Sequence, residues 1–198
     1  MSSVAEPRIT PREYLERERS AEYRSEYVNG RVYAMTGASR AHNVITVNAS
    51  RELSGQLGGR PCEVYASAMR VKVGPTGLYT YPDVVVVCGT PAFEDRHADT
   101  LLGPGVIIEV LSPSTAGYDR GEKFAHYRRL ASLREYVLVS QDRMRVEHYA
   151  RQGERWVLTE LNAPEHVVAL ESIGCTLRLG DLYERVELPP PDELPIRS

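Results

Sequence analysis

The stretch Val106-Ile107-Ile108-Glu109-Val110-Leu111 decides the fold, because an acidic residue stands inside an otherwise aliphatic run. A run of this kind is typical of a strand that is buried on both faces of a sheet. Side chains alternate along a strand, so residues 107, 109 and 111 are expected on one face, with 108 and 110 on the other. A buried carboxylate is costly unless it meets a cation, a proton or a metal ion. Glu109 is therefore the first candidate for a functional residue.

A second aliphatic run, Val84-Val85-Val86-Val87, lies upstream and follows Tyr81-Pro82-Asp83. If the two predicted strands are neighbours, Asp83 at the start of one meets Glu109 in the other. Two carboxylates in that position repel each other unless a cation lies between them. Carboxylate oxygens, together with a backbone carbonyl and water molecules, suit Mg²⁺ or Mn²⁺. Such an ion lowers the pKa of bound water and stabilises the charge on a phosphate during hydrolysis.

Capping and turn signals place the first elements. Thr10-Pro11-Arg12-Glu13 predicts the start of a helix that runs to about residue 19. Asn29-Gly30 predicts a tight hairpin within residues 26–35. A longer helix is expected from about Ser39 to Leu57, ended by two glycines. Its buried stripe is predicted to include, on or near one side, Val44, Val47, Leu53 and Leu57.

The remaining elements follow from alternation and length. Strands are expected at about 62–66, 69–73, 83–88, 105–111, 135–141, 145–151, 156–161 and 166–169. The connection 89–104 is long for a hairpin and is interpreted as a candidate mobile flap. Asp119-Arg120-Gly121-Glu122 predicts a capping box that opens a helix to about Ala131, and a small helix is expected at 181–185. This order predicts a mixed α/β (α+β) domain over residues 1–188, with a central sheet flanked by helices, and a Pro-rich acidic tail at 189–198.

Positive charge is carried almost wholly by arginine. Of 24 basic residues only Lys72 and Lys123 are lysines, and the net charge of the chain is −3. Arginine stays protonated whereas lysine can shift its pKa, so a lysine 14 residues after Glu109 suggests a catalytic role. Segment 119–155 has a local balance of +3, but its charges also suit a solvated helix and hairpin. The overall charge argues against nonspecific coating of nucleic acid and does not exclude binding it.

The compartment is predicted from the cysteines and the N-terminus. Cys62, Cys88 and Cys175 are widely spaced and form no CxxC motif, which we interpret as reduced structural thiols. Residues 1–20 are charged and lack the apolar core of a signal peptide. No apolar run approaches the length of a membrane span. We therefore expect a cytoplasmic protein with no membrane partner.

Several motifs together resemble a known family. Pro82-Asp83 followed by Glu109-Val110-Leu111 resembles the signature of the PD-(D/E)xK nuclease superfamily. The more specific set is Glu26-Tyr27-Val28-Asn29-Gly30, Ala41-His42-Asn43, Ile108 to Thr115, Asp119, Lys123, Tyr127 and Glu135-Tyr136. Over about residues 10–185 this set resembles a large, mostly uncharacterised bacterial family of predicted restriction endonucleases within that superfamily. The resemblance implies a restriction-endonuclease-like fold, Mg²⁺- or Mn²⁺-dependent hydrolysis of nucleic acid, preferentially DNA, and a homodimer.

The resemblance also implies roles for individual residues. The superfamily lysine lies two residues after the glutamate, but here that position is Leu111, and Lys123 on the next predicted helix matches the lysine of the family. The implied catalytic residues are Asp83, Glu109, Lys123 and Glu26, with the metal held by Asp83, Glu109 and the Val110 carbonyl. Lys123 would orient or deprotonate the attacking water. The implied substrate-binding residues are His42, Ser112 and Tyr127.

Structural alternatives stay open for these residues. A Glu109–Lys123 salt bridge would make the site purely structural, and Asp119 is interpreted as a helix cap rather than a ligand. The alternatives for the other candidates are a solvated strand residue for Glu26, a structural helix start for His42, turn formation for Ser112 and simple packing for Tyr127. At the level of function, the alternatives to a nuclease are a non-catalytic nucleic-acid-binding or regulatory protein and a structural dimerisation domain.

Overall fold

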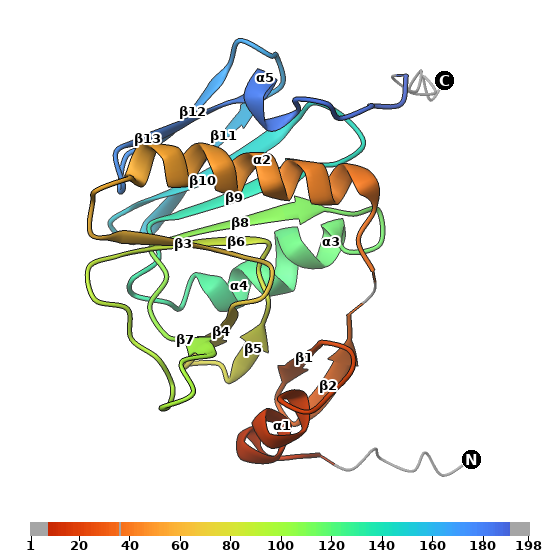
Figure 1. The fold of residues 1–198 in the computed structure, drawn as a ribbon, viewed down its shortest axis with the longest axis vertical. Helices are drawn as coiled ribbons and strands as arrows, with labels where there is room; N and C mark the ends of the chain where they lie inside the picture. The colour runs from red at the N-terminus through yellow and green to blue at the C-terminus, as the bar shows by residue number, and fades with distance from the viewer. Residues whose placement is uncertain (1–7, 36, 191–198) are drawn as a thin grey trace.

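A six-stranded mixed sheet forms the centre of the computed structural model, which describes residues 8–35 and 37–190. Its strand order is β11-β10-β9-β8-β6-β3 (Figure 1). The strands are β3 (Cys62–Ala66), β6 (Val84–Cys88), β8 (Val106–Leu111), β9 (Glu135–Ser140), β10 (Val146–Gln152) and β11 (Arg155–Leu161). β8 pairs in parallel with β9 and antiparallel with β6. The two aliphatic runs are therefore neighbours in the middle of the sheet.

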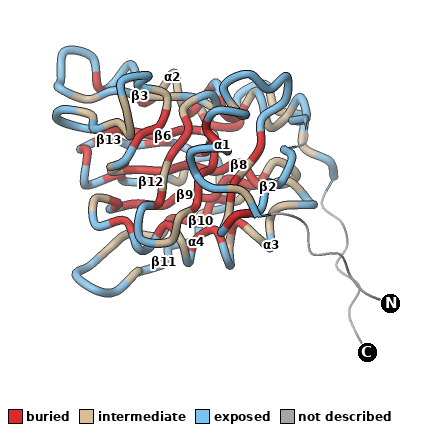
Figure 2. Tube along the Cα trace, turned by 90° about the horizontal axis from the view of Figure 1, so that it is seen from below, coloured by how far each residue is buried: buried red, intermediate tan, exposed pale blue. Residues whose placement is uncertain are grey.

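Helices cover both faces of this sheet. α2 (Arg40–Leu57) packs on one face, where Ile108 and Val110 belong to the core. The other face, with Ile107 and Leu111, is covered by the segment made of α3 (Ala116–Tyr118), η1 (Asp119–Lys123) and α4 (Phe124–Tyr127). Every residue of β8 is buried, and Figure 2 shows the buried backbone running through the central strands. The predicted alternation and the mixed α/β architecture are confirmed.

A smaller sheet, with the order β2-β1-β5-β4-β7, lies beside the helical segment. Its strands are β1 (Ser25–Val28), β2 (Arg31–Ala34), β4 (Arg70–Val73), β5 (Leu78–Thr80) and β7 (Thr100–Leu101). The predicted hairpin is present, and both turn residues, Asn29 and Gly30, have positive φ (49° and 89°) as a tight primed turn requires. α1 (Pro11–Glu18) begins with the predicted Thr10 capping box. The chain closes with β12 (Val167–Leu170), β13 (Cys175–Arg178) and α5 (Leu179–Leu182).

Three expectations about the elements are wrong. Val47 is 64% exposed, because the buried face of α2 is formed by Ile45, Ala49, Leu53 and Leu57. The connection 89–104 is not a free flap, because β7 within it pairs with β4 and its aspartates bind Arg19. The predicted helix over 119–131 instead begins at Ala116 and ends at Tyr127, so the expected capping box at Asp119 does not form.

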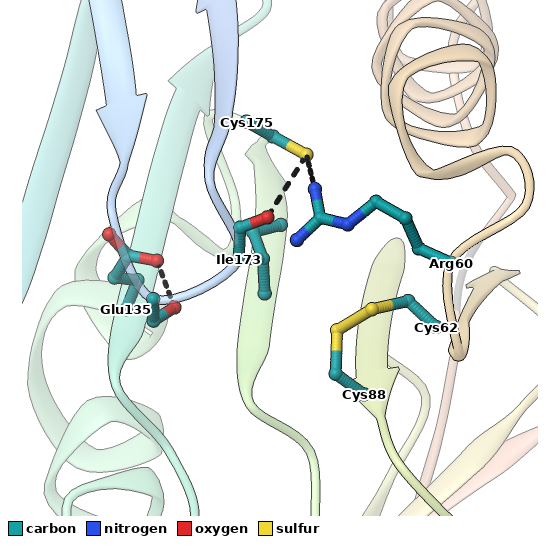
Figure 3. Close-up of a disulfide and its surroundings, with 7 residues drawn as sticks. Arg60, Cys62, Cys88, Glu135, Ile173 and Cys175 are labelled. Carbon is teal, nitrogen blue, oxygen red and sulfur yellow. Dashed lines mark hydrogen bonds between the residues drawn. A yellow bond between two sulfur atoms is a disulfide. The ribbon is translucent and has the colours of Figure 1, made fainter.

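The cysteine prediction is wrong for two of the three residues. Cys62 and Cys88 form a disulfide, because the antiparallel register of β3 and β6 places them directly opposite each other (Figure 3). Cys175 is free and buried, with Arg60 Nη1 3.9 Å from its sulfur. The cytoplasmic prediction thereby loses its argument from reduced thiols. In the described ranges no helix is both long and apolar enough to cross a membrane. The predicted tail at 189–198 lies, beyond residue 190, outside the described residues.

Candidate active site

The site begins where β8 extends beyond β6. The pairing of these strands ends at Ile108 and Val84, so residues 109–111 have no partner in β6. Asp83 takes that place, and the Val110 N–H donates to its Oδ2 at 2.7 Å. The N–H and C=O of one strand residue point to the same side, so the Val110 carbonyl also faces Asp83. Asp83 and the Val110 backbone therefore lie together at one end of the sheet, and Glu109 is close enough for the Asp83 charge to raise its pKa.

The first turn of α2 holds the other oxygen of Asp83. Ser39 caps this helix by accepting a hydrogen bond from the His42 N–H at 3.1 Å. The His42 ring then reaches Asp83, with 2.7 Å between Nε2 and Oδ1. Both oxygens of Asp83 are thus fixed, one by backbone and one by His42. The structure places His42 on a predicted metal ligand, which the sequence did not indicate.

Glu109 and Lys123 form a buried ion pair. Lys123 Nζ lies 2.9 Å from Glu109 Oε1, and the Tyr127 hydroxyl donates to the same oxygen at 2.8 Å. Burial raises the pKa of Glu109 to about 8, although the Lys123 charge acts in the opposite direction. A lysine on the helical segment therefore does reach the acid on β8, as the departure from the superfamily signature requires.

Two further carboxylates surround the same lysine. Glu26 Oε1 lies 3.2 Å from Lys123 Nζ, and Asp119 Oδ1 lies 3.6 Å from it. Glu26 comes from the hairpin of the smaller sheet, where Thr80 Oγ1 donates to its Oε1 and the Tyr118 hydroxyl donates to its Oε2 at 3.2 Å. The Glu26 side chain is only 12% exposed, so it is not a solvated strand residue. The site is consequently built from both sheets.

Asp119 and Lys123 bound a single π-helical turn, η1. Such turns are rare, and they occur frequently at functional sites because they re-aim side chains within a helix. Asp119 is buried inside this turn instead of capping a helix, which corrects its predicted role. Burial raises the pKa of its carboxyl, while Lys123 opposes that shift. The four-residue spacing from Asp119 to Lys123 is the sequence signal that could have indicated the contact between these two residues.

The charges of the site do not balance. Four carboxylates, those of Glu26, Asp83, Glu109 and Asp119, belong to it, and within residues 8–35 and 37–190 the only ammonium among them is that of Lys123. Burial by itself would lower the pKa of Lys123, but Glu109, Glu26 and Asp119 raise it well above its usual value. Lys123 therefore stays positive, and the surplus negative charge calls for protons or a further cation.

The site offers a magnesium-type ion two carboxylates and one backbone carbonyl as ligands. Among the described residues, no three His, Cys, Asp or Glu side chains converge in a manner that could hold a metal ion. Mg²⁺ commonly binds through one or two carboxylates and keeps several waters, so Asp83, Glu109 and the Val110 carbonyl are a sufficient set. Each carboxylate oxygen has two lone pairs, so the hydrogen bonds from His42 and the Val110 N–H leave Asp83 able to bind an ion.

The other two predicted substrate residues take different places. Tyr127 is fully buried and bonds Glu109, so in this structure it positions an acid and is inaccessible to a substrate. Ser112 Oγ lies 3.0 Å from Ser114 Oγ and 2.9 Å from Thr115 Oγ1, which shapes the turn after β8. A contact between Ser112 and substrate stays a prediction. The residues that sequence reasoning missed are Tyr118 and Thr80, which position Glu26 and carry no recognisable motif.

One family model and two relatives match most of the chain. The Uma2 family model, described as "Putative restriction endonuclease", matches residues 11–180. An uncharacterised protein of Synechocystis sp. (strain ATCC 27184 / PCC 6803 / Kazusa) is 43% identical over 154 residues, which cover 77% of this chain and 87% of the relative. A second uncharacterised protein of that strain is 35% identical over 179 residues, covering 89% and 92%.

A solved structure shares the fold. The crystal structure of "a putative nuclease belonging to DUF820" from Anabaena variabilis matches with a TM-score of 0.73. The match covers 88% of this chain and 97% of that one, at 21% sequence identity. At this identity the likeness shows the fold alone.

Proposed function

The chain belongs to the Uma2 family of putative restriction endonucleases, and from this premise we propose that it is a metal-dependent endonuclease that hydrolyses phosphodiester bonds in DNA. We further propose that its central sheet is the PD-(D/E)xK nuclease core, with the lysine supplied by η1 instead of β8. The family and the shared fold support the proposal, and the geometry of the site gives it a mechanism. The homodimer and the cytoplasmic location remain predictions.

The surplus of buried carboxylates is the observation that carries the proposal. A structural ion pair needs one acid for one base, and such pairs contribute little net stability even when they are well made. Here three acids lie within 3.6 Å of one lysine, and Asp83 adds a fourth carboxylate to the cluster. An arrangement of this kind is costly for the folded chain by itself. It becomes favourable when a divalent cation and the phosphate that it binds enter the site.

Each residue then has a stated task. Asp83, Glu109 and the Val110 carbonyl would hold Mg²⁺, which supplies a bound water of lowered pKa and neutralises phosphate charge. Lys123 stays protonated, so its ammonium orients the attacking water and stabilises the charge that develops on the phosphate. Glu26, held by Thr80 and Tyr118 beside Lys123 Nζ, would accept a proton during the reaction. His42 and Tyr127 keep the two acids of the metal site in place.

The test is cleavage of supercoiled plasmid and single-stranded DNA with Mg²⁺ or Mn²⁺, with and without EDTA. Lys123→Met should lower the cleavage rate by about 10²-fold or more, because transition-state stabilisation of this kind is usually worth that much. Lys72→Met is the matched control, since it removes the only other lysine, which is paired with Glu94. A crystal soaked in Mn²⁺ provides a second measurement, with an anomalous peak expected between Asp83 and Glu109.

Full metal-dependent cleavage by Lys123→Met would refute the role given to Lys123. No peak at Asp83 and Glu109, combined with no cleavage of any DNA, would favour the structural alternative, in which Glu109 and Lys123 are only an ion pair. Binding of DNA without cleavage and without any effect of metal would instead favour the non-catalytic alternative.

A further inference from the structure

Four arginines on the helical side of the central sheet have no acidic partner. We call Arg128, Arg129, Arg134 and Arg151 the arginine patch, and among the described residues no ion pair joins any of them to an Asp or a Glu. Arg128, Arg129 and Arg134 are exposed, and Arg151 is half-buried. Arg120, by comparison, is neutralised by Glu147. The patch is therefore a concentration of unbalanced positive charge in a chain whose net charge is −3.

Aromatic rings hold two of these arginines in place without neutralising them. The Arg128 guanidinium lies 5.0 Å from the Phe124 ring centre, and the Arg151 guanidinium lies 4.7 Å from that of Trp156. The two rings contact each other edge to face, with their centres 5.3 Å apart. A guanidinium stacked on a ring keeps its charge and most of its N–H donors. The patch is thus both ordered and available to an anion.

Arg151 is bound by the end of the helical segment and differs in this from the rest of the patch. Its Nη2 donates to the carbonyls of Arg128 and Leu130 at 2.7 and 2.9 Å, as expected of a cation at a helix C-terminus. Its Nε, however, is buried and makes no hydrogen bond. Burial lowers the pKa of Arg151, and the nearby charge of Arg134 lowers it further. Helix capping therefore explains one arginine of the patch and leaves the charge of the other three unused.

Two short links connect the patch to the candidate active site, one along the chain and one through a hydrogen bond. The Arg128 guanidinium stacks on the ring of Phe124, and Phe124 directly follows Lys123 in the sequence. The Arg134 N–H donates to the Gly105 carbonyl at 2.8 Å, and Gly105 precedes Glu109 by four residues. At the usual rise of a strand this separation is about 13 Å along β8. One strand of DNA rises about 3.4 Å per nucleotide, so the strand path from Gly105 to Glu109 is as long as about four nucleotides.

We propose that the arginine patch binds the phosphate backbone of the DNA substrate a few nucleotides from the bond that is cleaved. The proposal rests on the proposed function, and it explains how a site with surplus carboxylates attracts a polyanion. Guanidinium groups suit phosphate because they donate two parallel hydrogen bonds to it. Binding of this kind is independent of sequence and positions the scissile bond.

The experiment measures binding separately from cleavage. A fluorescein-labelled 20-bp DNA duplex is titrated with the full chain in EDTA at several salt concentrations. Arg128→Gln/Arg129→Gln should weaken binding several-fold and reduce the slope of log K against log[salt] by about one to two, since each phosphate contact contributes about 0.9. Arg128→Lys/Arg129→Lys should keep the slope of the wild type, because it retains the charge. Arg17→Gln/Arg96→Gln removes two exposed arginines elsewhere and is the control.

An unchanged slope in Arg128→Gln/Arg129→Gln, or an equal loss in the Arg17→Gln/Arg96→Gln control, would overturn the proposal. A wild-type chain that does not bind the duplex at low salt would overturn it as well. Cleavage by the wild type and by Glu109→Gln is measured in parallel. If the wild type cleaves DNA with metal but the patch variants bind with an unchanged salt slope, the endonuclease proposal holds and the arginine-patch proposal is wrong. If the slope changes in the patch variants but the wild type does not cleave DNA, the patch proposal holds and the endonuclease proposal is wrong.

Discussion

The two lysines of the chain sit in opposite environments. Lys72 Nζ lies 2.7 Å from Glu94 and over the ring of Tyr79, and its side chain is 27% exposed. Lys123 is buried and faces three carboxylates. The first arrangement is balanced, with one acid, one base and access to water. The second is unbalanced and buried, so it cannot be explained as a device for stability. The number of acids around a lysine, and not the presence of an ion pair, separates the candidate site from the framework.

Removal of each lysine should show the largest contrast. In the absence of metal, Lys123→Met is expected to lower the free energy of unfolding by about 3–5 kcal/mol, because it leaves buried carboxylates without a cation. Lys72→Met should cost about 0–1 kcal/mol, because that pair is partly solvated. Urea denaturation with EDTA measures both.

The double variant Glu109→Gln/Lys123→Met sharpens the comparison. It removes one buried charge of each sign, so it should be more stable than Lys123→Met alone. Equal costs for the two single lysine variants would mean that the surplus acids of the site are already neutralised by protons, and the comparison would fail.

The same contrast can be tested on the tyrosines that touch each glutamate. The Tyr127 hydroxyl donates to Glu109 at 2.8 Å in the buried site, and the Tyr79 hydroxyl donates to Glu94 at 3.2 Å. Tyr127→Phe should cost about 1–3 kcal/mol, because it removes a donor from a fully buried carboxyl oxygen, and Tyr79→Phe about 0.5–1.5 kcal/mol, because Glu94 keeps Lys72 as a partner and is 20% exposed. Thermal unfolding of the two variants, which lose the same atom, measures the difference. A larger cost for Tyr79→Phe would show that Glu109 does not depend on Tyr127.

Local signals in the sequence were sufficient for the elements that position the acids. The aliphatic runs predicted β6 and β8, and the Thr10 cap, the Asn29-Gly30 turn and the glycines after Leu57 predicted α1, the hairpin and α2. Each of these signals acts over a few residues, where propensity and capping decide the structure. The alternation along β8 also placed Glu109 on the face that the helical segment covers.

Features that depend on distant partners could not be predicted in this way. β7 has only two residues and exists because β4 lies beside it, and the disulfide follows from a register between strands that lie far apart in the chain. The contact of Glu26 with Lys123 joins β1 of the smaller sheet to η1. The π turn at Asp119 changes which side chains share a helix face, and no propensity scale describes it. The composition and the resemblance selected Lys123, but only the fold shows how many acids surround it.

The pH dependence of stability gives the last contrast between the balanced and the unbalanced site. The pKa of Glu109 is raised to about 8, chiefly by burial, from 4.5 in a solvated chain. The folded protein therefore binds a proton that the unfolded chain has released between these values. Stability must then fall as the pH rises through this window, by at most about 1.4 kcal/mol per pH unit.

Urea denaturation of the metal-free protein between pH 6 and 7.5 measures the slope. Glu109→Gln should lose it, because glutamine does not titrate, whereas Glu94→Gln should keep it. If Glu109→Gln retains the slope of the wild type, the proton belongs to another group, and Glu109 is held as a carboxylate by Lys123 after all.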